Sequence, residues 1–271
     1  MTQTYIFIDG SYFCFYRYHA LLTWWKNAYP EQTEVIQDPY SNTLFVEKFK
    51  KTFNDNITKI PKGLKIPKNT NYHIIVGKDC KRQNIWRQEL YPKYKANRDN
   101  ESFMGGPFFK MVYEEELFIK AGATAILSHP KLEADDCIAL SVKHLLKSND
   151  DIDIYIITSD KDYLQLARHN VHIFNLAFKD LTEQKSCNKD SECDLFCKII
   201  MGDTSDNIPS VFPKCGPKTA LKYFENKELL QKKLQENEEY KKQYELNKTI
   251  IDFDYIPQQL QDEFLLGTNK L

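Results

Sequence analysis

The feature that most constrains the fold of this chain is a series of short apolar runs, most of which are followed by acidic residues. The runs are rich in β-branched and aromatic residues, and segments with helical spacing lie between them. This alternation predicts an α/β fold with a central, mostly parallel sheet flanked by helices. The predicted strands are 5–8, 71–76, 123–127, 152–157 and 171–175. The predicted helices are 12–25, 44–53, 108–121, 135–146, 194–201, one that begins near Pro217, and a charged region at 225–247, before an apolar return to the core at 250–257.

Carboxylates gather behind these predicted strands. Seven of them follow four strands, namely Asp9, Asp79, Glu133, Asp135, Asp136, Asp160 and Asp162. Ligands of parallel sheets bind beyond the carboxyl ends of the strands, so we expect these acids to converge in one pocket. Asp203 and Asp206 follow the helix 194–201 and are three residues apart, so they can share one face.

Nine carboxylates in one pocket repel one another unless cations neutralise them. Oxygen ligands suit Mg²⁺ or Mn²⁺, and two such ions need an acid-rich cavity with room for water and substrate. A pair of ions would support phosphodiester hydrolysis. Helix capping is a simpler alternative for Glu133, Asp135 and Asp136 alone. No histidine lies among the acid motifs, which disfavours zinc there, although the spacing of Cys187, Cys193 and Cys197 leaves a separate zinc site open.

A basic stretch beside the acids indicates the substrate. Residues 78–98 contain seven Lys and Arg residues and two acids, and Trp86, Tyr91 and Tyr94 lie among them. Cations interleaved with aromatic rings suit a groove for single-stranded nucleic acid. Removing nine acids held by metal from the net charge of −1 leaves +8, so a near-neutral total hides a cationic face. The predicted helix start near Pro217 has lysines close by and suits a backbone phosphate.

With these residues in view, the chain resembles the 5′ nuclease family of flap endonucleases and 5′-3′ exonucleases. Seven motifs carry the resemblance in the family's order: Phe-Ile-Asp-Gly-Ser (7–11), Gly-Lys-Asp (77–79), Tyr-Lys-Ala-Asn-Arg (94–98), Glu-Ala-Asp-Asp (133–136), Thr-Ser-Asp-Lys-Asp-Tyr-Leu-Gln-Leu (158–166), Gly-Asp-Thr-Ser-Asp-Asn-Ile-Pro (202–209) and Gly-Pro-Lys-Thr-Ala (216–220). They cover most of the chain, which looks most similar to the phage-type ribonuclease H and exonuclease members.

The resemblance implies a PIN-like catalytic domain at residues 1–190, with a basic arch at about 80–107, and a helical helix-hairpin-helix subdomain at 191–271. The chain departs from the family pattern at the hairpin, because Lys214 stands where the first of two glycines is usual and only Gly216 remains. We expect a free-standing nuclease, since no polymerase domain or clear sliding-clamp peptide follows.

The resemblance also implies residue roles. Five acids surround a first metal ion, namely Asp9, Asp79, Glu133, Asp135 and Asp136. Four serve a second ion, partly through water, namely Asp160, Asp162, Asp203 and Asp206. Lys95 and Arg98 contact the scissile phosphate and complete the catalytic set with Asp9, Asp79 and Asp136. Further nucleic-acid contacts are Lys81, Arg82, Arg87, Lys93, Lys214, Gly216, Lys218 and Thr219. The implied cofactors are two Mg²⁺ or Mn²⁺ ions, with K⁺ as a candidate at the hairpin.

The expected function is therefore a metal-dependent, structure-selective 5′ nuclease that cuts DNA at 5′ flaps or 5′ ends in replication or repair. RNA in RNA–DNA hybrids is a further candidate substrate, and single-strand-binding protein is a candidate partner. We expect an intracellular, cytoplasmic monomer without membrane contact, because no apolar run approaches the roughly 18 residues of a membrane span. One alternative is a nucleic-acid-binding protein on the same scaffold that has lost catalysis. A haloacid-dehalogenase-type phosphatase is another, but it needs a second Asp where Ser11 stands.

Overall fold

A five-stranded parallel sheet forms the centre of the computed structural model, which describes residues 3–98, 103–149 and 151–268. The strand order is β3-β2-β1-β4-β5, and every pair of neighbours is parallel. The strands are β1 (Gln3–Asp9), β2 (Tyr72–Gly77), β3 (Ala125–Leu127), β4 (Ile152–Ile157) and β5 (Val171–Phe174). The predicted α/β fold is confirmed, and the predicted strand bounds agree within two residues.

Helices cover both faces of this sheet. They are α1 (Gly10–Ala28), α2 (Thr33–Gln37), α3 (Thr43–Gly63), α4 (Trp86–Leu90), α5 (Gly106–Glu114), α6 (Leu117–Lys120), α7 (Ala134–Ser148), α8 (Ser191–Met201), α9 (Pro217–Glu225), α10 (Lys227–Gln235), α11 (Glu238–Ile251) and α12 (Gln258–Gly267). Short 3-10 helices accompany them, namely η1 (Pro39–Ser41), η2 (Arg82–Asn84), η3 (Lys161–Leu166) and η4 (Phe253–Tyr255).

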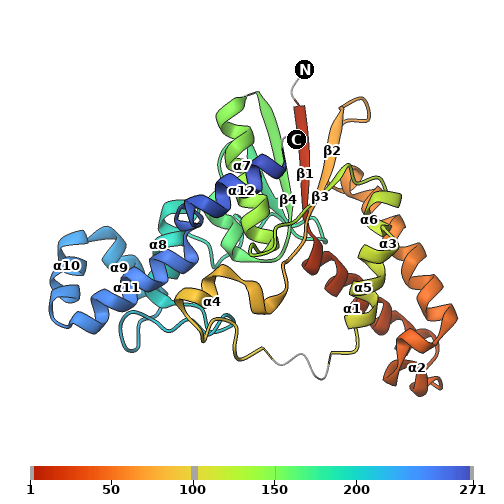
Figure 1. Ribbon diagram of the computed structural model, residues 1–271, viewed down its shortest axis with the longest axis horizontal. Helices are drawn as coiled ribbons and strands as arrows, with labels where there is room; N and C mark the ends of the chain where they lie inside the picture. The colour runs from red at the N-terminus through yellow and green to blue at the C-terminus, as the bar shows by residue number, and fades with distance from the viewer. Residues whose placement is uncertain (1–2, 99–102, 150, 269–271) are drawn as a thin grey trace.

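The two faces of the sheet carry separate cores because side chains alternate along each strand. Ile6 and Ile8 of β1 join a cluster with α1, α3, α5 and α6. Tyr5 and Phe7 point the other way and pack with α7 and α12. Figure 1 shows these helices on either side of the sheet. Because all neighbouring strands are parallel, their carboxyl ends lie along one edge of the sheet, and the segments that follow β1, β2 and β4 meet there.

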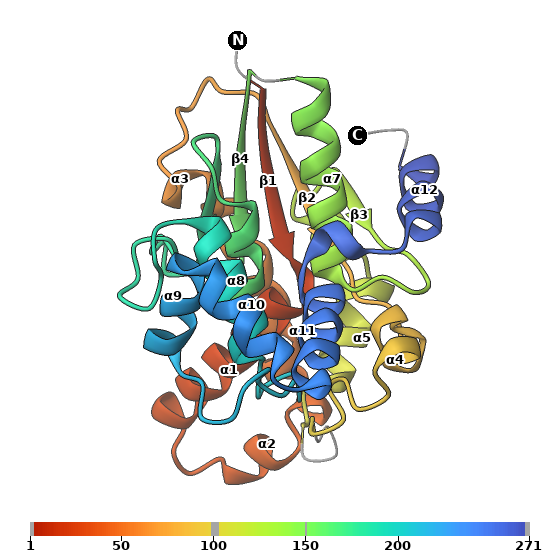
Figure 2. The same ribbon diagram turned by 90° about the vertical axis from the view of Figure 1, so that its left-hand side faces the viewer.

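The C-terminal helices have a third core of their own. Residues of α8, α9, α10 and the segment between α8 and α9 form it, with Phe196, Phe212 and Tyr223 among its large side chains. The chain then returns to the sheet, because Phe253 and Phe264 belong to the core under α7. Figure 2 shows α12 beside α7 and the helices α8–α11 below them. The predicted apolar return to the core is confirmed, whereas a domain boundary near residue 190 stays a prediction.

One predicted helix is broken in the structure, and one predicted helical region contains two helices. The segment predicted as one helix at 108–121 is broken between α5 and α6, where Glu116 adopts a left-handed backbone with φ of 55°. The charged helical region predicted at 225–247 consists of two helices, α10 and α11. Asn226 and Asn237 cap these two helices through side-chain bonds to backbone N–H groups, and such caps begin new helices.

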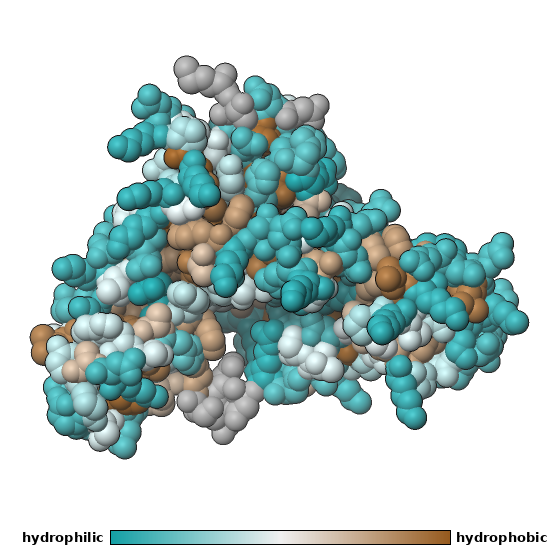
Figure 3. Space-filling model, turned by 180° about the vertical axis from the view of Figure 1, so that it is seen from behind, coloured by the Kyte–Doolittle hydropathy of each residue, from teal (hydrophilic) through white to brown (hydrophobic). Residues whose placement is uncertain are grey.

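The surface is hollowed between two lobes. Seen from behind, one lobe contains α1–α3 and α5, and the other contains the C-terminal helices (Figure 3). The acid-bearing edge of the sheet lies between them. None of the described helices is both long and apolar enough to cross a membrane.

Candidate active site

Carboxylates from four separate stretches of the chain line one cavity of about 1080 Å³ beyond the carboxyl ends of the strands. One is the last residue of β1, one follows β2, two lie at the start of α7, and one follows β4. They are Asp9, Asp79, Glu133, Asp135 and Asp160. The predicted convergence is therefore present for five of the nine acids, and their roles as ligands stay predictions.

Asp9 and Asp79 lie beside each other at the ends of neighbouring strands. Asp9 caps α1 by accepting a bond of 2.9 Å from the backbone N–H of Tyr12. Asp79 accepts a bond of 2.8 Å from the N–H of Ala134, which ties β2 to the start of α7. Burial, together with the charge of Asp79, raises the pKa of Asp9 to about 7. The site therefore contains uncompensated negative charge.

Asp135 is the acid of α7 most open to a cation. It is 9% exposed, lines the cavity, and pairs with no basic side chain in the described parts of the chain. Burial raises its pKa well above the usual range, and the neighbouring charges of Asp136 and Glu133 add to this effect. Ligand oxygens of these three acids lie within 4.8 Å of one another, which is suitable for one metal ion.

Asp136 is fully buried, and its oxygens are already occupied. The guanidinium of Arg87 donates to both of them at 2.8 and 2.7 Å. The indole of Trp86 and the backbone N–H of Glu133 donate to Oδ2 at 3.0 and 3.1 Å. Direct ligation of a metal by Asp136 would require Arg87 to withdraw, so the geometry favours a positioning role for this acid.

Arg87 differs from its predicted role. Its side chain is buried at 2% exposure, and it also donates to Glu133 at 3.0 Å and to the carbonyl of Ile250 at 2.7 Å. The expectation that it contacts nucleic acid is wrong in this structure, because a guanidinium enclosed by carboxylates cannot reach a phosphate. Nothing in the sequence around Arg87 indicated that its side chain would be buried.

A second group of acids lies around Lys198 of α8. Its ammonium contacts Asp162 and lies 2.8 Å from Oδ2 of Asp203. Burial opposes ionisation of Asp203, but Lys198 and hydrogen bonds from Ser205 outweigh it and lower the pKa. Asp160 and Asp203 both line a neighbouring cavity of about 630 Å³. Asp160 thus borders both cavities.

Asp206 is tied to the two predicted phosphate-contacting cations. Arg98 lies 2.5 Å from its Oδ1, and Lys95 lies 3.7 Å from its Oδ2. Lys95 also lies 2.6 Å from Oε1 of Glu133, so it bridges acids from two distant segments. Both cations line the large cavity. Their contact with a scissile phosphate stays a prediction.

The donor set fits hard divalent cations. The acids that face the two cavities offer only carboxylate oxygens, and such ligands suit Mg²⁺ or Mn²⁺. The raised pKa values of Asp9 and Asp135 indicate negative charge without a cationic partner, and a divalent cation held there would supply the neutralising charge.

The remaining basic side chains of the predicted arch differ in accessibility. Lys81 and Lys93 are exposed. Arg82 is exposed but donates to the carbonyls of Lys95 and Arg98, so it holds the turn that carries these cations. Residues 99–102 of the predicted arch lie outside the described residues.

Two of the three aromatic residues of this stretch are unavailable for the expected stacking on bases, whereas Tyr91 is only partly buried. Trp86 and Tyr94 are buried at 2% and 3% exposure, so neither can stack on a base. Instead, the cavity wall contains the rings of Phe15, Phe103 and Phe109. Sequence reasoning missed these rings because an aromatic-rich segment such as α1 equally indicates ordinary packing.

The predicted hairpin contacts lie on the surface around the start of α9. Lys214, Lys218 and Thr219 are exposed, and Gly216 precedes the first turn of this helix. Lys214 adopts φ of 55° in the left-handed region that favours glycine. The structure therefore shows strain where the family usually has glycine. Nucleic-acid contacts and K⁺ binding here stay predictions.

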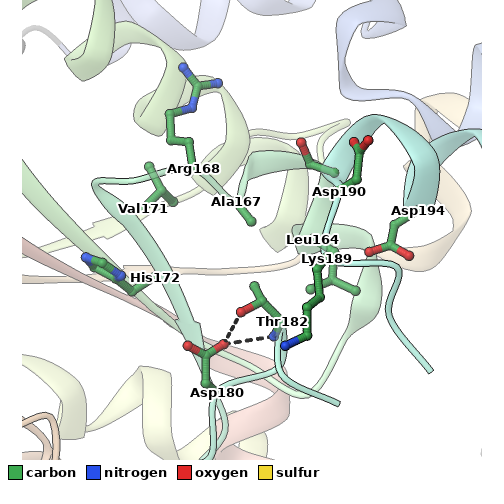
Figure 4. A pocket seen from close by; sticks show the side chains of 11 residues that line it. Leu164, Ala167, Arg168, Val171, His172, Asp180, Thr182, Lys189, Asp190 and Asp194 are labelled. Atoms are coloured by element: carbon green, nitrogen blue, oxygen red, sulfur yellow. Dashed lines mark hydrogen bonds between the residues drawn. The ribbon is translucent and has the colours of Figure 1, made fainter. Parts of the chain in front are cut away.

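A smaller cavity of about 220 Å³ lies between β5 and the start of α8 (Figure 4). Its acids are occupied by local partners. Asp180 accepts from the backbone and hydroxyl of Thr182 at 2.8 and 2.6 Å, and Asp190 caps α8. Asp194 accepts from Asn188 at 2.9 Å. This cavity is therefore a weaker candidate for a metal site than the acidic edge of the sheet.

The fold and the acidic cavity together define a class, namely a PIN-like α/β protein whose carboxylates collect beyond a parallel sheet. The chain belongs to the 5′-3′ exonuclease family. The family model described as 5′-3′ exonuclease, N-terminal resolvase-like domain, matches residues 4–192.

Similar proteins agree with this membership. The chain is 34% identical over 174 residues to a 5′-3′ exonuclease of Buchnera aphidicola subsp. Acyrthosiphon pisum (strain APS), covering 62% of this chain and 55% of that protein. It is 35% identical over 147 residues to DNA polymerase I of Treponema pallidum (strain Nichols), covering 50% of this chain and 14% of the polymerase. The chain spans about half the length of the 5′-3′ exonucleases that it matches.

Solved structures share the fold over nearly the whole chain. A bacteriophage T5 flap endonuclease in a pseudo-enzyme–product complex with DNA and metal ions has a TM-score of 0.64 at 17% identity. A T5 5′-exonuclease with bound zinc has a TM-score of 0.64 at 19% identity. Each match covers 97% of both chains. At these identities the likeness concerns the fold alone.

Proposed function

We propose that this protein is a divalent-metal-dependent 5′ nuclease that hydrolyses phosphodiesters at 5′ flaps or 5′ ends of DNA in replication or repair. The single observation that carries the proposal is the cavity in which five carboxylates from distant segments face Lys95 and Arg98. Acids suit metal ions and the cations suit a phosphate, so one cavity can bring both together. Membership of the 5′-3′ exonuclease family supports the same activity.

Two Mg²⁺ or Mn²⁺ ions are the proposed cofactors. The first would be held by Asp79, Glu133 and Asp135, with Asp9 close by. The second would be held by Asp160, Asp162 and Asp203. When bound, such ions activate water and neutralise the charge of the reacting phosphate. The metal-bound T5 structures support metal binding on this fold.

Arg87 and Asp136 keep the acids in place. Their buried pair fixes the first turn of α7, and the bond from Arg87 to Glu133 orients that carboxylate toward the cavity. Asp206 holds Arg98 and helps to hold Lys95 at the rim. We propose that these two cations contact the scissile phosphate.

The proposed substrate is DNA with a 5′ flap or a free 5′ end, with RNA of RNA–DNA hybrids as a second candidate. Residues 191–271 are proposed as the helix-hairpin-helix part that grips the duplex through Lys214, Gly216, Lys218 and Thr219. The T5 flap endonuclease complex with DNA supports a DNA substrate. Exposed Lys81 and Lys93 would add non-specific contacts to phosphates.

The experiment is cleavage of 5′-labelled flap, nicked and hybrid substrates in the presence of Mg²⁺, with Asp135→Asn as the inactive variant. Glu114→Gln is a matched control, because it removes an exposed carboxylate on α5 whose one ion pair within the described part of the chain is with Lys110 at 3.6 Å. We expect cleavage by the wild type and the control and none by Asp135→Asn. Equal cleavage by all three proteins would contradict the proposal and favour a contaminating nuclease.

A further inference from the structure

The second proposed metal position already contains a cation supplied by the chain. Lys198 extends from α8, and its ammonium contacts Asp162 and Asp203, which come from different segments. The lysine side chain is 19% exposed, and the two carboxylates are 13% and 20% exposed. A single ammonium therefore bridges two of the three acids proposed to hold the second ion.

The first position is arranged differently. Asp9, Asp79 and Asp135 form no ion pair with a basic side chain in the described residues, so a metal ion there meets ligands that are not already paired. Glu133 is the exception, because Lys95 and Arg87 contact it. The two positions thus have similar carboxylates. At the second position a lysine pairs with two of the three acids, whereas at the first position basic side chains pair only with Glu133 among the described residues.

We propose that Lys198 is a built-in counter-cation, which a divalent ion must displace from Asp162 and Asp203 before it can bind at the second position. This inference rests on the proposed function. The ammonium lies between Oδ1 of Asp162 and Oδ2 of Asp203. A divalent ion placed between the same two side chains would be only a few ångströms from the ammonium, and like charges that close repel strongly in a part-buried site. The two cations therefore compete for one place.

The structure provides room for the exchange. Lys198 lines the cavity of about 630 Å³ together with Asp160, Asp203 and the polar residues Thr204 and Ser205. A lysine has a flexible four-carbon stem and a compact charge, so its ammonium can leave the acids and stay hydrated in this cavity. Without metal, Lys198 prevents Asp162 and Asp203 from repelling each other.

Two consequences follow. The second ion binds more weakly than the first, because its binding includes the loss of two ion pairs. Removing the ammonium strengthens that binding and, at the same time, destabilises the metal-free protein. A residue that only supports the local fold would give the second effect without the first.

The test is a Mn²⁺ titration of the EDTA-treated full-length protein, followed by electron paramagnetic resonance, with Lys198→Met and the milder Lys198→Gln. The matched control is Lys161→Met, since Lys161 lines the same cavity but contacts Ser186 at 2.9 Å instead of a carboxylate. We expect the weaker Mn²⁺ site to tighten at least about tenfold in both Lys198 variants. The stronger site should change by less than about threefold, and so should both sites of the control.

Thermal unfolding supplies a second readout. In EDTA, Lys198→Met should melt below the wild type, and saturating Mn²⁺ should raise its Tm more than it raises that of the wild type. A weaker site that is unchanged or loosened in both Lys198 variants would overturn the inference. An equal Mn²⁺-induced rise in Tm would also overturn it.

The inference and the proposed function fail in different ways. A wild type that binds no Mn²⁺ and cleaves no flap would contradict the proposed function. If it binds two ions and cleaves, yet Lys198→Met has the same two binding constants, only the displacement of Lys198 is contradicted.

Discussion

At the scale of single residues, Asp9 shows that the acidic cavity lowers the stability of the metal-free protein when its carboxyl group is ionised. The carboxyl group is enclosed at the end of β1, where Asp79 and Asp160 add to the negative field. Its pKa in the folded state is about 7, whereas an Asp in an unfolded chain has a pKa of about 3.9. Folding thus favours the protonated form of this residue.

The linkage between folding and proton binding at Asp9 determines how the stability of the protein changes with pH. Because the folded pKa is raised, the stabilising contribution of Asp9 is fully present below about pH 4 and is lost as the pH rises through about 7. Asp9→Asn removes this titration. Between pH 5 and pH 8 in EDTA, its free energy of unfolding should rise relative to the wild type by on the order of 2 kcal/mol. Urea unfolding measures the difference, and a constant difference across this range would contradict the assignment.

Lys95 is the residue for which binding and cleavage should separate. Burial alone would lower the pKa of its ammonium, but Glu133 and Asp206 outweigh burial and raise it, so the charge is permanent. Its backbone adopts φ of 55° and donates to the carbonyl of Asp206 at 2.8 Å. Such strain at a charged residue indicates that its position matters.

Lys95→Ala should lower the single-turnover cleavage rate about 100-fold while raising the Kd for flap DNA less than about fivefold. Lys93→Ala, which removes an exposed charge two residues away, should weaken binding slightly and leave the rate unchanged. Filter binding in Ca²⁺ and quenched-flow cleavage in Mg²⁺ provide the two quantities. An equal loss in both would assign Lys95 to general docking.

The residue scale is also where sequence reasoning fell short. The position of an acid after a strand predicts which edge it occupies, and this was sufficient for Asp9, Asp79, Asp135 and Asp160. The position of an acid after a strand does not show which basic side chain pairs with that acid. Arg87 lies in a basic stretch and resembles a DNA contact, yet it pairs with an acid 49 positions away. Long-range pairing of this kind has no periodic signature.

At the scale of elements, the turn after α8 places Asp203. Gly202 has φ of 70° and ψ of −168°, a backbone region that is essentially restricted to glycine. A Cβ at this position would lie 2.4 Å from the carbonyl oxygen of Ile208 and 2.5 Å from that of Pro209. Both obstacles are backbone, so they cannot move aside cheaply.

Gly202→Ala should therefore destabilise the protein by about 2 kcal/mol or more and weaken Mn²⁺ binding through displacement of Asp203. Gly216→Ala is the matched comparison, because a Cβ there meets nothing within 4 Å and φ is −105°. Its stability should stay within about 0.5 kcal/mol of the wild type. Chemical denaturation distinguishes the two, and similar losses would contradict this explanation.

Helices and strands were predictable where the local sequence alone contains the signal that forms them. The strand at 152–157 and the helix after Glu133 follow from apolar runs and an acidic first turn. The break at Glu116 did not follow, because apolar residues at helical spacing continue across this position. Tertiary packing decides there whether one helix continues or another begins.

At the scale of the whole molecule, Arg87 connects the acidic edge to the C-terminal helices. Its guanidinium bonds Asp136 and Glu133 at the start of α7, and Nε donates to the carbonyl of Ile250 in α11. The predicted catalytic and duplex-binding parts therefore share one buried network. Movement of α11 would disturb the acids.

Arg87→Ala should destabilise the protein by about 3–5 kcal/mol, because it leaves the buried Asp136 without its cation and removes one of the two cations beside Glu133. Part of this loss should return in saturating Mn²⁺, since a metal ion can neutralise Glu133. Denaturation curves with and without Mn²⁺ give both values. The exposed Arg168→Ala serves as control, and a loss below 1 kcal/mol in Arg87→Ala would contradict the role assigned to this network.

The overall architecture was the most predictable level. Alternating strands and helices give a parallel sheet with right-handed crossovers, and that sheet has one edge for ligands. The return of Phe253 to the sheet core was also visible as an apolar run. The packing of α12 against α7 was not, because its alternating polar residues resemble an exposed helix.

The central claim is that acids far apart in the chain hold a pair of divalent ions at one edge of the sheet. Anomalous scattering from crystals soaked in Mn²⁺ tests it most directly. The expected map shows one peak among Asp79, Glu133 and Asp135 and a second among Asp160, Asp162 and Asp203. A map without peaks in this region, or with Mn²⁺ only at unrelated surface carboxylates, would contradict the claim.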